Sequence, residues 1–146
     1  EYPTFKIEVS FYGKDYNAII TKSDINNDLC LMEIQSEYAY KTKKIQIAGE
    51  KPKLGETVYS LSAPLGIASD FTRMKFRGSW AGCDSELTLE DYCYYTIPSA
   101  PGSSGSGVFN QYGELVSIIS IAMNGFNEIS GGPRQYAIKE IIRKYD

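Results

Sequence analysis

The 146-residue sequence contains no histidine. Histidine is the usual general base at neutral pH and the commonest metal ligand in proteins, so a catalytic function here needs a proton acceptor from another source. The three cysteines form an odd set without the spacing of a zinc site. Phosphate-binding loops and cofactor fingerprints are also missing. We therefore expect neither a metal nor a cofactor.

Long apolar runs and an excess of positive charge are missing as well. No stretch approaches the ~18 to 20 apolar residues that cross a bilayer, and the first residues lack the basic flank and apolar core of a signal peptide. The net charge of -3 and the pI near 5.1 argue against a surface that binds a phosphate backbone. We expect no nucleic-acid or membrane partner, and the sequence does not indicate a cellular location.

What is present is the composition of one ordinary folded domain, with 42% hydrophobic and 23% charged residues. Short stretches rich in Val, Ile, Tyr, Phe and Thr alternate with clusters of turn-forming residues, which predicts an all-β sandwich or barrel. The expected strands cover residues 5–12, 16–21, 28–34, 57–62, 70–80, 92–97, 107–109 and 114–121. At the C-terminus, Ile138, Ile141 and Ile142 recur at helical spacing among charged residues and predict one short amphipathic helix.

The cysteines differ in their surroundings. Cys30 lies within an apolar run, and we expect it to pack as a small hydrophobic residue. Cys83 and Cys93 flank a polar loop, where they can form a disulfide in an oxidising compartment or stay reduced elsewhere.

The segment with the most chemical content is Gly102-Ser103-Ser104-Gly105-Ser106-Gly107, which lies between two expected strands. A serine between glycines on a sharp turn can expose its hydroxyl while successive backbone N–H groups converge on one point, as an oxyanion hole requires. The alternative is an ordinary loop, since turn formation by itself accounts for clusters of glycine and serine.

Residues 94–118, which contain this turn, resemble the nucleophile region of trypsin-like and HtrA-like serine proteases. In that family a Gly-x-Ser-Gly turn is followed by a few apolar residues, a tight turn and a strand. Three other segments resemble the family in the same order. Residues 23–34 resemble the family's Asp-Leu-Ala-Leu-Leu segment. Residues 54–66 resemble the strand and the Pro-x-Gly turn that open the second barrel. Residues 135–138 resemble the last strand before the terminal helix.

The resemblance implies a chymotrypsin-like double β-barrel with a short C-terminal α-helix, in a single trypsin-like peptidase domain. Residues up to about 50 would be the remainder of a first barrel that is incomplete in this chain, residues 51–137 the second barrel, and residues 138–146 the helix.

The resemblance also implies site residues. Ser104 is the expected nucleophile, and Asp28 is the acid that orients a histidine. The turn Gly102, Ser103 and Ser104 is the expected oxyanion hole, with the N–H groups of Gly102 and Ser104 as donors. The substrate polypeptide would lie extended against a strand edge. The expected substrate-binding residues are Pro98, Ser99, Ala100, Pro101, Ser120, Ile121 and Ala122.

The pocket for the side chain before the scissile bond has no acid at its matching positions, so we expect an apolar or small side chain there. Part of residues 125–132 also belongs to the expected wall, and the charged Glu128 would change this preference if it faced the pocket. Ser103 occupies a position where many digestive relatives have aspartate, so an HtrA-like or viral-like branch fits best.

The family's histidine lies a few tens of residues before the aspartate, whereas Asp28 is near the start of this sequence. We expect an upstream segment or a second chain to supply the histidine and the missing strands, which gives a serine endopeptidase. The alternative is a catalytically inactive protease fold that serves binding or assembly.

Overall fold

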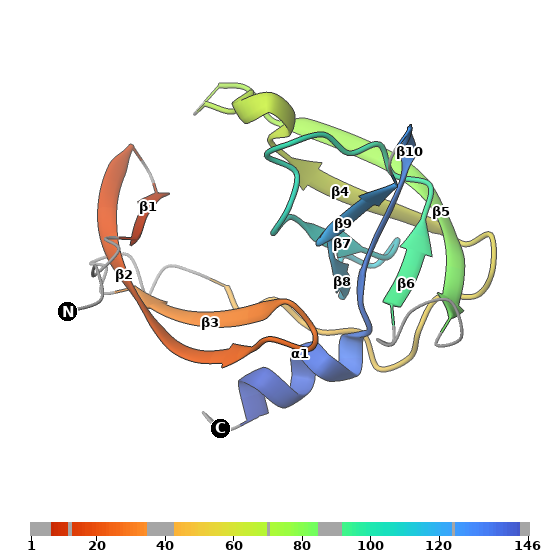
Figure 1. Cartoon of the computed structure of the whole chain (residues 1–146), viewed down its shortest axis with the longest axis horizontal. Coiled ribbons are helices and arrows are strands. Elements are labelled where there is room, and N and C mark those ends of the chain that lie inside the picture. The colour runs from red at the N-terminus through yellow and green to blue at the C-terminus, as the bar shows by residue number, and fades with distance from the viewer. Residues whose placement is uncertain are drawn as a thin grey trace.

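The computed structural model describes residues 7–11, 13–34, 43–69, 71–84, 92–123 and 125–143. Strands make up most of this part of the chain, and one α-helix and a short 3-10 turn accompany them (Figure 1). In chain order the elements are β1 (Ile7–Phe11), β2 (Lys14–Asp24), β3 (Leu29–Ile34), β4 (Thr57–Ser62), η2 (Pro64–Gly66), β5 (Met74–Asp84), β6 (Tyr92–Tyr95), β7 (Gly107–Phe109), β8 (Leu115–Ile118), β9 (Ile121–Met123), β10 (Phe126–Pro133) and α1 (Gln135–Ile142).

The strands form two antiparallel sheets. The first sheet has three strands in the order β1-β2-β3, and the second has seven in the order β8-β7-β4-β5-β6-β10-β9. The larger sheet curls on itself, and the smaller one lies to its side (Figure 1). This mostly-β architecture with one C-terminal helix agrees with the expected fold class.

The larger sheet encloses the main core because its strands alternate inward and outward residues. In β4, Val58 and Ser60 are fully buried whereas Leu61 is exposed. The rings of Trp80 and Tyr95 stack across β5 and β6 with their centroids 5.9 Å apart. The buried members of this core are Ala48, Val58, Trp80, Cys93, Tyr95, Ile97, Val108, Val116 and Ile119.

Helix α1 packs against the smaller sheet through a second apolar cluster. Ala137, Ile138 and Ile141 are buried together with Leu29 of β3. The Lys22 Nζ of β2 also donates to the carbonyls of Glu140 and Ile141, both at 3.1 Å, near the end of the helix. A cation at this end is favourable because the last carbonyls of a helix carry partial negative charge.

The C-terminal region differs from the sequence-based expectation. Residues 135–138 form the first turn of α1 and not a strand, and the last strand is β10. The buried positions Ala137, Ile138 and Ile141 follow helical spacing, and Pro133 ends the preceding strand because it has no N–H to continue a ladder. The expected strand over residues 114–121 is divided into β8 and β9, and residues 144–146 of the expected helix lie outside the described part.

Two of the three cysteines form a disulfide, and the third is free. Cys83 and Cys93 are directly paired across β5 and β6 and form a disulfide. The expectation that Cys30 packs as a small hydrophobic residue is wrong, because Cys30 is exposed. Side chains alternate along β3, so the packing of Leu29 and Leu31 against α1 turns Cys30 to the other face.

Candidate active site

The Gly/Ser turn between β6 and β7 is closed by its own hydrogen bonds. The Ser103 N–H donates to the Ala100 carbonyl at 2.9 Å, and the Ala100 N–H donates back to the Ser103 hydroxyl at 3.2 Å. The Ser106 N–H donates to the Ser103 carbonyl at 3.2 Å. Ser103 is only 1% exposed. Its side chain therefore holds the turn from inside, and the next residue, Ser104, is presented outward.

A second turn, η2, fixes the start of the Gly/Ser turn. Gly102 has a φ of +96°, and a Cβ at this position would lie 2.6 Å from the Ala63 carbonyl oxygen. The Leu65 N–H donates to the Pro101 carbonyl at 2.6 Å. Only glycine fits both this backbone conformation and this close approach.

Ser104 is exposed, and two N–H groups beside it have no hydrogen-bond acceptor among the described residues. In the described part of the chain, the N–H groups of Gly102 and Ser104 donate to no acceptor, whereas those of Ser103 and Gly105 donate to Ala100 and Ile119. The turn thus offers one hydroxyl and two unpaired donors, and the Ser103 N–H is not available as a third. Two such donors are what a developing oxyanion needs.

Asp28 lies in the turn between β2 and β3, directly before β3. Its φ is 51°, a left-handed conformation that aspartate tolerates better than most residues, and its N–H donates to the Ile25 carbonyl at 3.3 Å. Asp28 is exposed, and its carboxylate forms no hydrogen bond within the described residues. No hydrogen bond within that part of the chain links Asp28 to Ser104.

The two expected substrate-binding segments flank one strand, β10. On the β6 edge, the Ser130 hydroxyl donates to the Ile97 carbonyl and the Ser99 N–H donates to the Asn127 carbonyl, at 2.9 and 2.8 Å. On the other edge, the Ser120 N–H donates to the Gly131 carbonyl at 2.9 Å, and Ile121 and Ala122 pair with Gly131 and Ser130. Residues 98–101 and 120–122 are therefore brought to the same strand, and Glu128 of β10 is exposed.

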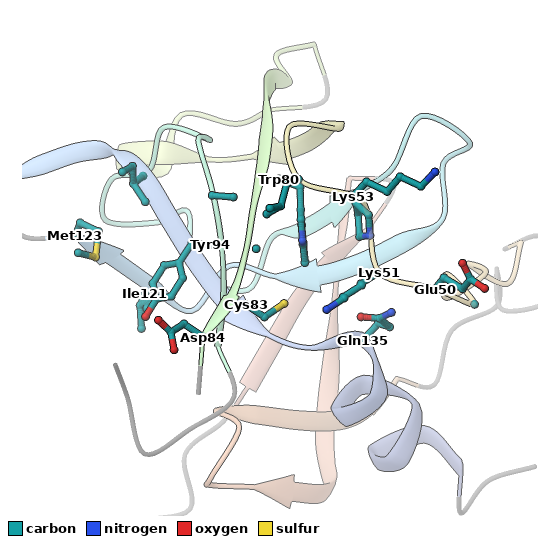
Figure 2. A pocket seen from close by; sticks show the side chains of 16 residues that line it. Glu50, Lys51, Lys53, Trp80, Cys83, Asp84, Tyr94, Ile121, Met123 and Gln135 are labelled. Carbon is teal, nitrogen blue, oxygen red and sulfur yellow. The ribbon is translucent and has the colours of Figure 1, made fainter. Parts of the chain in front are cut away.

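An open groove of about 1710 Å³ adjoins β9 (Figure 2). Met123, Ile121 and Tyr94 lie at one end of it, and Lys51 and Gln135 lie toward the other. The groove was not predicted from the sequence, because its lining comes from four strands, a loop and the start of helix α1, which are distant in the chain.

The role of η2 was also not predicted from the sequence. Pro64 and Gly66 indicate a turn there, but nothing in the sequence indicates that the turn contacts Gly102. Among the described residues, no group of acidic or cysteine side chains could hold a metal ion. No helix in the same part of the chain is long and apolar enough to cross a membrane.

Comparison with known families identifies the chain. Residues 3–118 match the family model of the trypsin-like peptidase domain, so the chain belongs to that family. A comparison with curated proteins found no match.

Solved protease structures share the fold. The active form of the Rv3671c protease from M. tuberculosis superposes with a TM-score of 0.79 at 15% identity, over 96% of this chain and 63% of that one. Its inactive form gives a TM-score of 0.75 at 14% identity, over 95% and 72%. The serine endoprotease from Yersinia pestis gives 0.78 at 19% identity, over 98% of this chain and 49% of that one. These structures show that the fold is that of proteases such as these, and the chain spans about half to three quarters of their length.

Proposed function

We propose that this chain carries the nucleophile and the acid of a serine endopeptidase, with Ser104 as the nucleophile and Asp28 as the acid. The observation that carries the proposal is the fixed turn that presents the Ser104 hydroxyl beside the two free N–H groups of Gly102 and Ser104. In an ordinary turn such exposed N–H groups bond to water, whereas here they lie beside an exposed hydroxyl, which is the combination that an oxyanion hole needs.

The reaction follows from these groups. The Ser104 hydroxyl attacks the scissile carbonyl carbon while a histidine takes its proton, and the Asp28 carboxylate holds that histidine in the required tautomer. The free N–H groups stabilise the negative charge on the carbonyl oxygen, and each such donor contributes about 3 to 4 kcal/mol at comparable sites. The amine leaves with a proton from the histidine, and water then releases the acyl group from Ser104.

The histidine must come from outside these 146 residues, from a flanking segment or from a second chain. The smaller sheet supports this part of the proposal. Ile20 and Met32 face each other across β2 and β3, yet they are 47% and 39% exposed. Strands β1 and β3 each have one edge without a strand partner in the described sheet. A segment that covers this apolar face and pairs with these edges can bring the base to Asp28.

The proposed substrate is an extended polypeptide that adds to β9. Among the described strands, β9 is at the edge of the larger sheet and has no partner on its outer side, so its outer N–H and C=O groups can pair with a further strand. The residue before the scissile bond then lies against Pro98–Pro101 and Ser120–Ala122, where we expect an apolar or small side chain.

A fluorophosphonate probe tests the proposal, because it reacts covalently with an activated serine. The protein with its native flanking sequence should be labelled on Ser104, and Ser104→Ala should abolish the label. Asp28→Asn should slow labelling strongly, since the equivalent change in a serine-histidine-aspartate triad lowers turnover by roughly four orders of magnitude. A folded protein that remains unlabelled with its flanking sequence present would contradict the proposal.

The second candidate is a catalytically inactive protease fold that serves binding or assembly. The observation in its favour is the absence of histidine from the whole sequence. The same labelling experiment separates the two functions, since a binding module leaves Ser104 unreactive whichever segment is added.

A further inference from the structure

Leu65 is a strained residue that the fold holds rigidly. Its φ is 56°, and residues other than Gly, Asn and Asp rarely adopt the left-handed region. Its N–H donates to the Pro101 carbonyl at 2.6 Å, and bonds from Gly66 to Ala63 and from Ile67 to Pro64, both 3.0 Å, fix the residues on either side. Such strain persists only where the surrounding structure enforces it, and it gathers at functional sites.

The side chain that this strained turn presents is apolar and open to solvent. Leu65 is 70% exposed, and Leu61 and Ile67, which flank it in the chain, are 55% and 45% exposed. Residues 61–67 contain no charged side chain. Contact with another apolar side chain would remove this surface from water, whereas a charged side chain placed here would lose hydration without gaining a partner from this segment.

The position of Leu65 relative to Ser104 indicates what covers it. The η2 turn contacts Pro101 and Gly102, at the start of the Gly/Ser turn. The segment leading into β9 contacts the other end, where Gly105 donates to Ile119 at 2.7 Å. If the substrate residues before the scissile bond pair with β9, the residues after the bond therefore extend from Ser104 toward η2.

We propose that Leu65 determines specificity after the scissile bond by binding an apolar side chain of one of the next two substrate residues. This inference rests on the proposed protease function and extends it to the leaving half of the substrate. The backbone strain at Leu65 is retained because it aims this side chain at the departing chain.

Peptide binding to the Ser104→Ala variant tests the proposal without any need for turnover. Two dye-labelled decapeptides carry Ala-Ala-Val before the scissile bond and either Leu-Leu or Asp-Asp after it, and fluorescence anisotropy gives their Kd values. We expect the Leu-Leu peptide to bind about tenfold more tightly, as one well-placed apolar contact allows. In the Ser104→Ala, Leu65→Asn double variant this ratio should fall to about threefold or less, because asparagine tolerates the same φ but offers no apolar surface.

Leu54→Asn in the Ser104→Ala background is the matched control. Leu54 is an equally exposed leucine, 77% accessible, on a different loop, and its replacement should leave the tenfold preference unchanged. Leu65→Gly repeats the test if the asparagine variant fails to fold, since glycine is the residue best suited to this conformation.

The proposal is overturned if the ratio is the same with and without Leu65, or if neither peptide is bound. Fluorophosphonate labelling keeps the two proposals separate, because the probe has no residues after the reactive centre. If Ser104 is labelled but the ratio of Kd values does not change without Leu65, the role of Leu65 is refuted and the protease function stands. If the ratio falls without Leu65 but Ser104 is never labelled, the peptide contact is supported and the protease function is not.

Discussion

The substitution Gly102→Ala tests how the Gly/Ser turn is built. An alanine at a φ of +96° costs about 1 to 2 kcal/mol for the left-handed backbone. Its Cβ would also lie 2.6 Å from the Ala63 carbonyl oxygen, so η2 or the turn must move. Movement weakens the bond from Leu65 to Pro101, which adds about 1 kcal/mol. We expect a total destabilisation of about 2 to 3 kcal/mol.

Gly113→Ala provides the matched comparison for this variant. Gly113 has a φ of +79°, and no heavy atom lies within 4 Å of a Cβ built there. It lies in the turn between β7 and β8. Its substitution should lower the free energy of unfolding only by the cost of a left-handed alanine, about 1 to 2 kcal/mol. The difference in unfolding free energy between the two variants therefore measures the effect of the close approach of η2 to Gly102.

Urea unfolding measures the stability of both variants, and fluorophosphonate labelling measures their effect on the site. Displacement of the Gly102 N–H should slow labelling by about 10² or more in Gly102→Ala and leave Gly113→Ala near the wild-type rate. Equal losses of stability and equal labelling rates in the two variants would contradict a close approach of η2 to Gly102.

Three further changes have defined outcomes. Ser103→Ala removes the acceptor of the Ala100 N–H, so the midpoint of urea unfolding should fall by an amount equivalent to about 1 to 3 kcal/mol and labelling should slow. Replacing Cys83 and Cys93 by serine should cost about 2 to 3 kcal/mol in the same assay, since the disulfide closes a loop of ten residues in the unfolded chain. Burial raises the pKa of Tyr95 above its usual value near 10. The neutral phenol therefore stabilises the fold fully below about pH 10, and this stabilisation is lost as the pH rises further. Tyr95→Phe should remove this alkaline loss of stability.

Each of these variants has its own check. A normal labelling rate in Ser103→Ala would show that the Ser103 hydroxyl does not shape the site. Wild-type protein in reductant should have the same stability as the double serine variant. If reductant does not change the stability of the wild-type protein, the disulfide is contradicted. For the pH profile, Tyr112→Phe is the control because Tyr112 is 78% exposed, and an equal alkaline effect from both variants would rule out Tyr95 as the source.

The sequence predicted those parts of the fold whose residues interact with near neighbours in the chain. The strands over residues 57–62 and 107–109 have the predicted bounds, because strand-forming residues there are flanked by strong turn signals. The strand ladder pairing Cys83 with Cys93 could not be predicted, since pairing depends on the register of β5 against β6.

Prediction failed where one local pattern has two structural solutions. Residues 135–138 fit either a strand end or a first helical turn, and the burial of Ala137 and Ile138 against Leu29 decides for the helix. At the site, the glycines indicated a special turn, but the left-handed conformation of Leu65 is imposed by bonds to distant residues. Leucine itself gives no signal of such a conformation.

The role of Ser104 as the nucleophile is tested most directly by mapping the site of fluorophosphonate modification by mass spectrometry in the protein with its native flanking sequence. We expect one modified residue, Ser104, with modification abolished in Ser104→Ala and much slower in Asp28→Asn. Modification at another residue, or none in protein shown to be folded, would contradict the assignment of Ser104 as the nucleophile.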